Sequence, residues 1–449
     1  MAEATASASR GNRLLLEQWV ELLEDDSFRR FWLMRLASHT AVNALSYSFL
    51  VFTVRHSDSA IATGLLLLTL IVPSALLGAI SGVAVDRLPR GLILCGANLL
   101  RAALVLLLVS AKDSLPSLYA IALGFGVLGQ FAGPAESAIV PHVVHSRRLV
   151  AANSFMQLGT LMSQVLGLLV LAPISLKTGA DDFLLLLAAG LFCLGAVLTT
   201  IIPQFHFTSS EDGRGVSLRT VRREFASAWL RLNRDSVAFL AFVLLVVTST
   251  QTLIVVTMLP KFSIEVLGVA PENLVFVLAP VGIAVFLGLR SVEFLAARLN
   301  RLVAISAAYV LMAASLIALG LVAGGADLLR SLDPLGAFGD ERLGEQAARI
   351  IVTMLLAGVY GFSLTVVLTM GRVLLNERVP LEMQGRVFAA QAVMTNLVAI
   401  GPVVLAGLLA DAVGVEPVLI SAGVGALLAA AWSQARSSRV VPATAGSEG

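Results

Sequence analysis

The chain has 449 residues, of which 57% are hydrophobic and 13% are charged, whereas an ordinary globular protein has roughly 45–50% and 25%. A soluble fold of this length could not bury so much apolar surface, so the composition indicates a protein that crosses a membrane several times. The formal net charge of +2 is too small for a nucleic-acid-binding protein. Two cysteines, both within apolar runs, exclude a disulfide framework and a zinc cluster.

The N-terminal segment, residues 1–30, is polar and is expected to be cytoplasmic. Within it, residues 13–24 place apolar side chains three or four positions apart with acidic side chains between them. This pattern fits a helix lying on the membrane surface, and it fits an ordinary soluble amphipathic helix equally well. No small-residue cleavage site follows an apolar core, so the segment is not expected to be a cleaved signal peptide.

Twelve apolar runs follow, each near the ~20 residues that a helix needs to cross the hydrocarbon of a bilayer. They form two sets of six, separated by the most charged segment of the chain. The predicted spans are 31–53, 60–83, 91–110, 117–138, 149–175, 183–203, 237–260, 273–290, 302–323, 349–374, 387–410 and 416–433. The sequence thus predicts an all-α membrane protein with twelve transmembrane helices.

The two sets predict two six-helix bundles, residues 31–203 and 237–433. A cytoplasmic linker, 204–236, joins them, and a cytoplasmic tail, 434–449, follows. Basic residues concentrate in alternate short loops, which places both termini in the cytoplasm. We expect a monomer in a bacterial inner membrane.

Similar short strings recur in the two halves. Arg148 and the following residues resemble the string at Arg386, 238 positions later, and Arg87 and its neighbours resemble those at Arg298, 211 positions later. The two offsets differ by 27 residues, which matches the longer outer loop 324–348 of the second half. Two halves repeated in the same orientation are the arrangement of major facilitator transporters.

The loop between the second and third predicted spans carries the clearest motif. Gly82, Asp86, Arg87 and Arg90 resemble the major facilitator loop signature Gly-x-x-x-Asp-Arg-x-Gly-Arg, although Pro89 stands where glycine is usual. An acid at a helix end can pair with arginines or with the positive N-terminus of a facing helix. The resemblance implies a gate in which this loop meets the start of the eleventh span, at Gly385 and Arg386, rather than residues that only fix topology.

Further stretches resemble the bacterial efflux branch related to enterobactin and macrolide exporters. They are Phe131–Ala138 with Pro141, and Val379-Pro380 with Gln384-Gly385-Arg386-Val387-Phe388. The resemblance implies transport by alternating access with export of a small amphipathic compound. The fifth span departs from the Gly-Pro-x-x-Gly-Gly pattern of many proton-coupled exporters, since Ser163–Leu169 has no proline beside its glycine.

Polar side chains at mid-span depth are expected to face a substrate cavity or to hydrogen-bond a neighbouring helix. The candidates are Asn43, Ser46, Tyr47, Gln130, Gln157, Gln164, Gln251, Thr252, Tyr360 and Asn396. They are all neutral, so the expected substrate is an amphipathic or apolar solute and not a multiply charged metabolite.

The candidates for proton coupling are Glu136, Asp86 and His39. Glu136 could instead be an interfacial acid paired with Arg101 or Arg147, and a single histidine in a helix could be no more than hydrogen-bonded. No charged residue is predicted at the centre of any span, and Arg101 is interpreted as lying at a span end. His142 and His145 lack a third ligand for a metal site.

No phosphate-binding loop and no nucleophile with a nearby base is present, so neither an enzyme nor a cofactor is expected. The leading prediction is proton-linked export of a drug, siderophore or metabolite across the inner membrane, with substrate, protons and membrane lipids as the partners. The alternatives are a lipid or lysophospholipid flippase on the same fold and a membrane scaffold that transports nothing.

Overall fold

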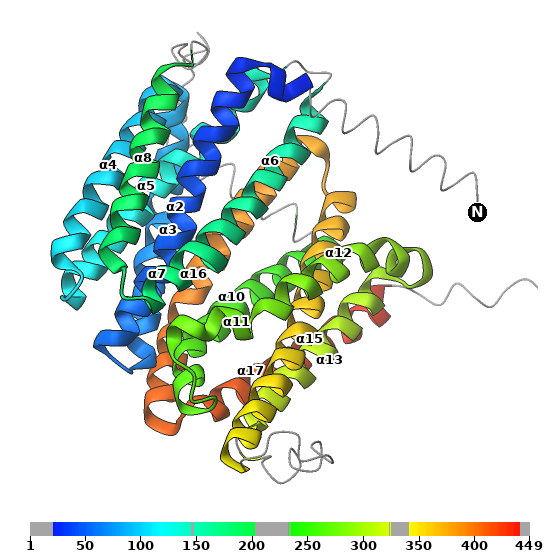
Figure 1. Cartoon of the computed structure of the whole chain (residues 1–449). Helices are drawn as coiled ribbons and strands as arrows, with labels where there is room; N and C mark the ends of the chain where they lie inside the picture. Colours follow the sequence, from blue (N-terminus) through cyan, green and yellow to red (C-terminus); the bar gives the residue numbers. More distant parts are fainter. Residues whose placement is uncertain are drawn as a thin grey trace, which may run out of the picture. The chain divides into compact units, whose positions relative to one another are not determined.

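The structure is a computed structural model that describes residues 21–144, 148–202, 232, 235–322, 324 and 341–440. Within these ranges the regular elements are all helices, which confirms the predicted all-α class. The chain divides into two compact units (Figure 1). Unit 1 comprises residues 1–56 and 69–216, and unit 2 comprises residues 57–68 and 217–449.

Six helical passes begin before the linker. Their elements are α2 (Asp26–His56), α3 (Ala60–Arg87), α4 (Arg90–Ala111), α5 (Leu115–Val143), α6 (Leu149–Gln164), η2 (Val165–Leu171), α7 (Ala172–Lys177) and α8 (Asp181–Thr200). The segment α6–η2–α7 forms a single pass. The first turns of α3 belong to unit 2 and the rest of α3 to unit 1, whereas the sequence placed the whole span in the first bundle.

Six further passes make up the remainder of unit 2. Their elements are α10 (Ser236–Glu265), η4 (Pro271–Asn273), α11 (Leu274–Val277), α12 (Ala279–Arg298), α13 (Arg301–Leu321), α15 (Glu341–Arg378), α16 (Leu381–Val413) and α17 (Val415–Val440). Here η4, α11 and α12 follow one another in the eighth predicted span. Each of the twelve predicted spans therefore coincides with a helical pass.

Eleven of the helices in the described ranges are long and apolar enough to cross a membrane by length and composition. The first predicted span, now α2, is 31 residues long but does not reach this hydropathy. Ser38, His39, Thr40 and Asn43 lie within it, and they lower the mean hydropathy of this helix.

The same helix pairs pack together in each unit. In unit 1, α2 packs on α6 and α8, and α4 packs on α5 and α8. In unit 2, α10 packs on α16 and α17, and α13 packs on α15 and α17. These are corresponding passes of the two halves, so the packing agrees with the duplication inferred from the sequence.

The fifth pass contains a π-helix, η2, of seven residues. Gly167 lies in it, and a Cβ atom there would come within 2.4 Å of the Thr40 carbonyl oxygen and 2.9 Å of the Ala44 nitrogen. Both are backbone atoms of α2, so only glycine allows α2 to pack this closely on η2. The π-helix therefore distorts the fifth pass, although this pass has no Gly-Pro pair.

Several sequence predictions lie largely outside the described residues. They concern residues 1–20, the three loop residues 145–147, most of the linker 204–236, most of the outer loop 324–348, and the tail from residue 441 onwards.

Candidate functional site

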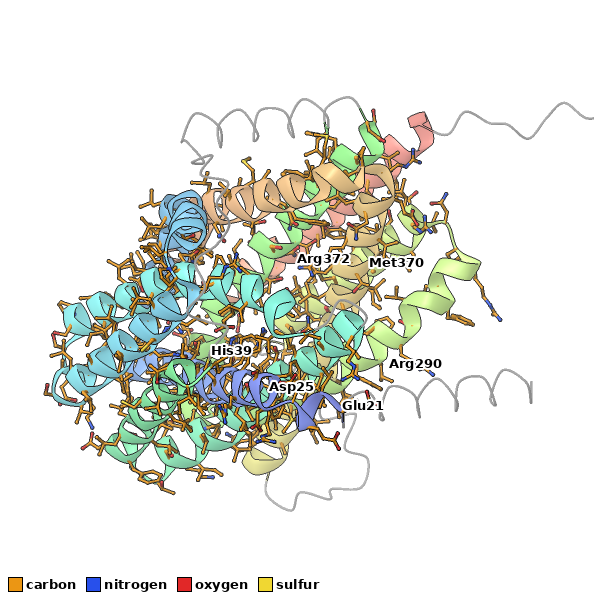
Figure 2. The ribbon with its side chains drawn as sticks, turned by 90° about the horizontal axis from the view of Figure 1, so that it is seen from above. Glu21, Asp25, His39, Arg290, Met370 and Arg372 are labelled. Carbon is orange, nitrogen blue, oxygen red and sulfur yellow. The ribbon has the colours of Figure 1, made fainter. Side chains whose placement is uncertain are left out.

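A buried carboxylate lies between helices α2 and α5 of unit 1. Glu136, on α5, is only 6% exposed. His39 Nε2 lies 2.9 Å from Glu136 Oε2, and Arg35 Nη1 lies 3.9 Å from the same oxygen. Arg35 and His39 are four residues apart, so one face of α2 presents both to the acid; Figure 2 shows His39 on this helix. The structure therefore brings together two residues that the sequence had named separately.

A second arginine lies inside the same unit. Arg101, near the middle of α4, is 7% exposed, and its guanidinium carbon is 5.9 Å from the centre of the Phe192 ring. It forms no hydrogen bond with the described residues, although Glu136 attracts it electrostatically. A Cβ atom on Gly129 would be 3.6 Å from Arg101 Nη2, an ordinary contact distance, so the guanidinium lies beside α5. The interpretation of Arg101 as a span-end residue is wrong, as is the expectation that no charge lies at the centre of a span.

Arg35 connects the buried acid to the fifth pass. Its Nη2 donates a hydrogen bond of 3.3 Å to Thr160 Oγ1 on α6. One turn earlier on α2, Trp32 Nε1 donates to the Phe155 carbonyl oxygen at 3.3 Å. A change in the position of the Arg35 side chain would therefore alter its contact with Thr160 on α6 as well as its contact with Glu136.

We call Arg35, His39, Arg101 and Glu136 the buried charge cluster. It contains one carboxylate, two guanidiniums and one imidazole, so its positive charges exceed its negative charge. Charged side chains at membrane depth are costly unless they are paired, and they commonly mark ion pathways. The side chain of His39 is 31% exposed while that of Glu136 is 8% exposed. The imidazole is thus the more exposed of the two groups, and the carboxylate is enclosed between the helices.

The predicted gating residues lie at two helix ends. Gly82, Asp86 and Arg87 are in the last turns of α3, and Gly385 and Arg386 are in the first turns of α16. The side chains of Asp86, Arg87 and Arg386 are outside what the structure describes. Arg90 begins α4, and its Nη1 donates to the Ala138 carbonyl oxygen of α5 at 2.9 Å. Arg90 therefore holds the part of α5 that carries Glu136.

The cavity candidates of unit 1 differ in exposure. Asn43 and Ser46 donate hydrogen bonds to carbonyl oxygens one turn earlier on α2, at His39 and Val42. Tyr47 is buried, Gln130 is half-buried, and Gln157 and Gln164 are exposed.

The candidates of unit 2 are mostly enclosed. Gln251 Nε2 donates to the Ala422 carbonyl oxygen at 2.7 Å, which joins α10 to α17. Thr252 bonds the Thr248 carbonyl oxygen one turn earlier. Tyr360 is 8% exposed and Asn396 is half-buried.

Unit 2 contains a polar cluster that the sequence analysis missed. Asp411, near the end of α16, accepts hydrogen bonds from the Ala60 nitrogen at 2.7 Å and the Ile61 nitrogen at 3.2 Å. It also accepts from the Ser59 hydroxyl, and Lys261 Nζ of α10 lies 2.8 Å away. We call this set the Asp411 clasp. The carboxylate caps the start of α3, where the first N–H groups have no helical partner.

Within the described ranges, no three His, Cys, Asp or Glu side chains come together to hold a metal. His142 lies in α5 with its side chain outside the description, and His145 lies outside it altogether.

The family model of the Major Facilitator Superfamily matches residues 31–402. No curated protein matches the sequence. Among solved structures, the nucleoside transporter NupG is similar, with a TM-score of 0.69, 12% identity and coverage of 92% of this chain and 99% of that one.

An auto-inhibited POT family peptide transporter has a TM-score of 0.67 at 11% identity, with coverage of 94% and 98%. A bacterial homologue of the human lysosomal transporter Spinster has a TM-score of 0.60 at 12% identity, with coverage of 94% and 97%. At these identities the likeness concerns the fold. The family match spans most of the chain, and the protein is a multi-pass membrane transporter that belongs to the major facilitator superfamily.

Proposed function

We propose that this transporter exports a small amphipathic compound across a bacterial inner membrane in exchange for protons, by alternating access. The observation that carries the proposal is the 2.9 Å contact between His39 Nε2 and the buried Glu136 Oε2. An acid with an imidazole at hydrogen-bonding distance can receive and pass on a proton.

The geometry supports a coupling path through Arg35. When a proton reaches Glu136 through His39, the carboxylate loses its charge and its attraction for Arg35 and Arg101. Arg35 still has its hydrogen bond to Thr160 on α6. Proton binding thus changes the forces between α2, α5 and α6. A transporter needs such a differential interaction to shift between two states.

Two features support an amphipathic substrate. The cavity candidates Asn43, Gln130, Gln164 and Asn396 are neutral, and large apolar side chains surround them in the spans. The resemblance of the fourth-to-fifth and eleventh-span stretches to enterobactin and macrolide exporters supports the outward direction. The proposed arrangement is a monomer with both termini in the cytoplasm and no cofactor.

The direct test is flux in inverted membrane vesicles with an imposed pH gradient, acidic inside. Fluorescent amphipathic drugs should accumulate in vesicles that contain the protein, and collapse of the gradient should release them. Accumulation that ignores the gradient would contradict proton coupling. Gradient-independent movement of fluorescent lipids would favour a flippase, and no movement of any probe would favour a scaffold.

The predicted gate at the loop after α3 is tested separately. Asp86→Asn should leave the protein folded but slow transport severely, because the acid can no longer pair across the gate. Unaltered flux in the same vesicles would exclude a gating role for Asp86.

A further inference from the structure

Helix α3 is shared between the two compact units. Residues 57–68 belong to unit 2, and the residues from Thr69 onwards belong to unit 1. Pro73 lies inside the helix, four residues after Thr69. Because proline has no N–H group, residue 73 cannot donate the usual helical hydrogen bond to the Thr69 carbonyl oxygen. The division between the units therefore coincides with the point where the helical bonding of α3 is weakest.

The first segment of α3, residues 60–68, is held by unit 2. The Asp411 clasp joins its first N–H groups to α16 and, through the cation of the clasp, to α10. Ala60 is 1% exposed and is a member of the hydrophobic core of unit 2. A Cβ atom at Gly407 of α16 would come within 2.9 Å of the Ile61 Cα atom, so only glycine allows the two helices to lie this close. Hydrogen bonds, charge and close backbone packing thus fix this segment to unit 2.

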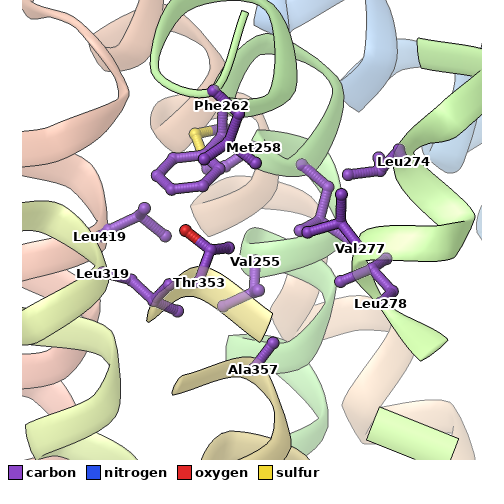
Figure 3. Close-up of a pocket in the computed structure, with 12 residues that line it drawn as sticks. Val255, Met258, Phe262, Leu274, Val277, Leu278, Leu319, Thr353, Ala357 and Leu419 are labelled. Carbon is purple, nitrogen blue, oxygen red and sulfur yellow. The ribbon is translucent and has the colours of Figure 1, made fainter. Parts of the chain in front are cut away.

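Helix α10 contacts the same segment of α3. A Cβ atom at Gly64 would be 3.4 Å from Thr257 Cγ2, an ordinary contact distance. Thr257 and Lys261 are four residues apart, so one face of α10 carries both this contact and the cation of the Asp411 clasp. Met258 and Phe262 lie on a different face of α10 and line a small apolar pocket inside unit 2 (Figure 3). Helix α10 is therefore anchored in unit 2 on one face and contacts α3 with another.

The second segment of α3, which begins at Thr69, packs in unit 1 instead. A Cβ atom at Gly126 of α5 would come within 2.8 Å of the Thr69 carbonyl oxygen, 3.2 Å of the Leu70 Cα atom and 3.0 Å of Pro73 Cγ. Two of these three are backbone atoms, so only glycine permits α5 to approach so closely. Helix α5 therefore packs directly against the turn of α3 that contains the proline.

We propose that α3 is a hinged helix: its first segment moves with unit 2, its second segment moves with unit 1, and the helix bends at residues 69–73 when the transporter changes state. If the whole helix moved with unit 1, all three hydrogen bonds that Asp411 accepts from residues 59–61 would break together, which is costly. Bending at Pro73 breaks no helical hydrogen bond of that residue, and sharp kinks in helices commonly occur at proline. The inference rests on the proposed alternating access but not on the substrate or the direction of transport.

A reversible disulfide lock tests whether the first segment stays with unit 2. Gly64→Cys is combined with Val403→Cys of α16, because a Cβ atom at position 64 would be 3.6 Å from Val403 Cγ1, close enough for two cysteines to form a disulfide. The lock is made in the full-length protein in lipid nanodiscs, with Cys95 and Cys193 replaced by alanine. Oxidation closes the lock and a reducing agent opens it.

Spin labels at Phe183 and Leu321 report the change of state. These residues are 62% and 55% exposed, and they lie near the start of α8 and at the end of α13. Each position follows an odd number of passes, as the start of α3 does, so all three lie on the same side of the membrane. Both residues are replaced by p-acetylphenylalanine, which takes a spin label without a cysteine. The distance between the labels, measured by double electron–electron resonance, should change equally in the locked and the reduced protein between about pH 5 and pH 8.

The results separate the hinge from the proposed function. A change of label distance in the reduced protein that the lock abolishes would overturn the hinge alone, because the first segment would then have to leave unit 2. A label distance that changes in neither protein would contradict the alternating access on which the hinge rests, and with it the proposed function.

Substitution of the proline tests the bend itself. Pro73→Ala restores an N–H group that can bond the Thr69 carbonyl oxygen, so the stiffer helix should reduce the change in label distance about twofold or more. Pro73→Gly keeps the backbone easy to bend and should preserve the change. Equal changes in label distance for the alanine and glycine variants would overturn the proposal.

Discussion

The two units use the same helix pairs but fill corresponding positions with different chemistry. The 211-residue offset relates Arg35, His39 and Arg101 to Val246, Thr250 and Met312, and the 238-residue offset relates Glu136 to Leu374. In unit 2, Val246, Met312 and Leu374 are buried members of one hydrophobic core. Unit 1 therefore has four ionisable side chains, of which Arg101 and Glu136 are buried, where unit 2 buries three apolar ones and a threonine.

This difference separates what the fold requires from what the function requires. The bundle of unit 2 shows that the architecture packs well with Val246, Met312 and Leu374 at these positions. Replacing buried ion pairs by apolar residues of similar size is often neutral or stabilising. The charges of unit 1 are therefore not explained by stability, which supports their assignment to proton coupling.

The largest expected effect comes from Glu136→Gln. The amide keeps the size of the side chain but cannot release a proton, so pH-gradient-driven accumulation should fall about 100-fold, in the range for loss of a proton-transferring group. Exchange of substrate without a gradient should continue, and the remaining flux should no longer depend on pH. Flux in inverted vesicles over a range of pH measures both.

The matched control is Leu374→Met at the corresponding position of unit 2. It should leave transport within about twofold because the exchange conserves volume. If transport by Glu136→Gln kept the pH dependence of the unaltered protein, proton coupling could not be assigned to Glu136 in unit 1.

The next largest effect concerns the close packing of η2 on α2. Gly167→Ala adds a Cβ atom within 2.4 Å of the Thr40 carbonyl oxygen, and overpacking of this kind costs about 1–3 kcal/mol. Thermal unfolding in detergent should show the loss. Leu405, 238 positions later and 57% exposed, is the control, since Leu405→Ala should change stability by less than about 0.5 kcal/mol. Equal losses of stability for Gly167→Ala and Leu405→Ala would mean that the packing of η2 on α2 does not require a glycine.

Arg101→Met gives unit 1 the residue that unit 2 has at Met312. Removing a cation makes Glu136 easier to protonate, so the pH at which transport is half-maximal should rise. Stability should stay the same or increase, because Arg101 forms no hydrogen bond with the described residues. The vesicle assay over a pH series measures the shift. If Arg101→Met left the pH dependence of transport unchanged, Arg101 would have no part in proton coupling. The control, Met312→Leu in unit 2, should leave the pH dependence unchanged.

The smallest effect is expected at the Asp411 clasp. Asp411→Asn keeps one acceptor oxygen but loses the charge that pairs with Lys261, whose side chain is 11% exposed. The loss should be about 1 kcal/mol in thermal unfolding. Asp182, whose pair with Lys112 in unit 1 is exposed, should tolerate Asp182→Asn with almost no change. A comparable loss for both substitutions would show that the clasp is no more than a surface ion pair.

The sequence predicted the helices well because most passes are continuous apolar runs, and the more polar α2 was predicted as well. It named Glu136 and His39 but not their contact, since residues 97 positions apart meet only through the register of two packed helices. Arg35 could have been found from its spacing of one turn before His39. Arg101 was misjudged because an arginine within an apolar run was assigned to its edge.

The remaining features depend on information that residue types do not carry. The Asp411 clasp uses backbone N–H groups at Ala60 and Ile61, and every helix start offers such groups whatever its sequence.

The π-helix η2 also has a consequence for comparing this chain with its relatives. A π segment closes its hydrogen bonds over five residues instead of four, so it contains one residue more than a straight α-helix of the same number of turns. In α-helical terms one residue corresponds to a rotation of about 100°, and α7 therefore presents a different face than a continuous helix from α6 would. An alignment with a relative whose fifth span is a plain α-helix should open a one-residue gap between Val165 and Leu171. Without that gap, side chains after η2 would be matched to counterparts on the wrong side of the helix.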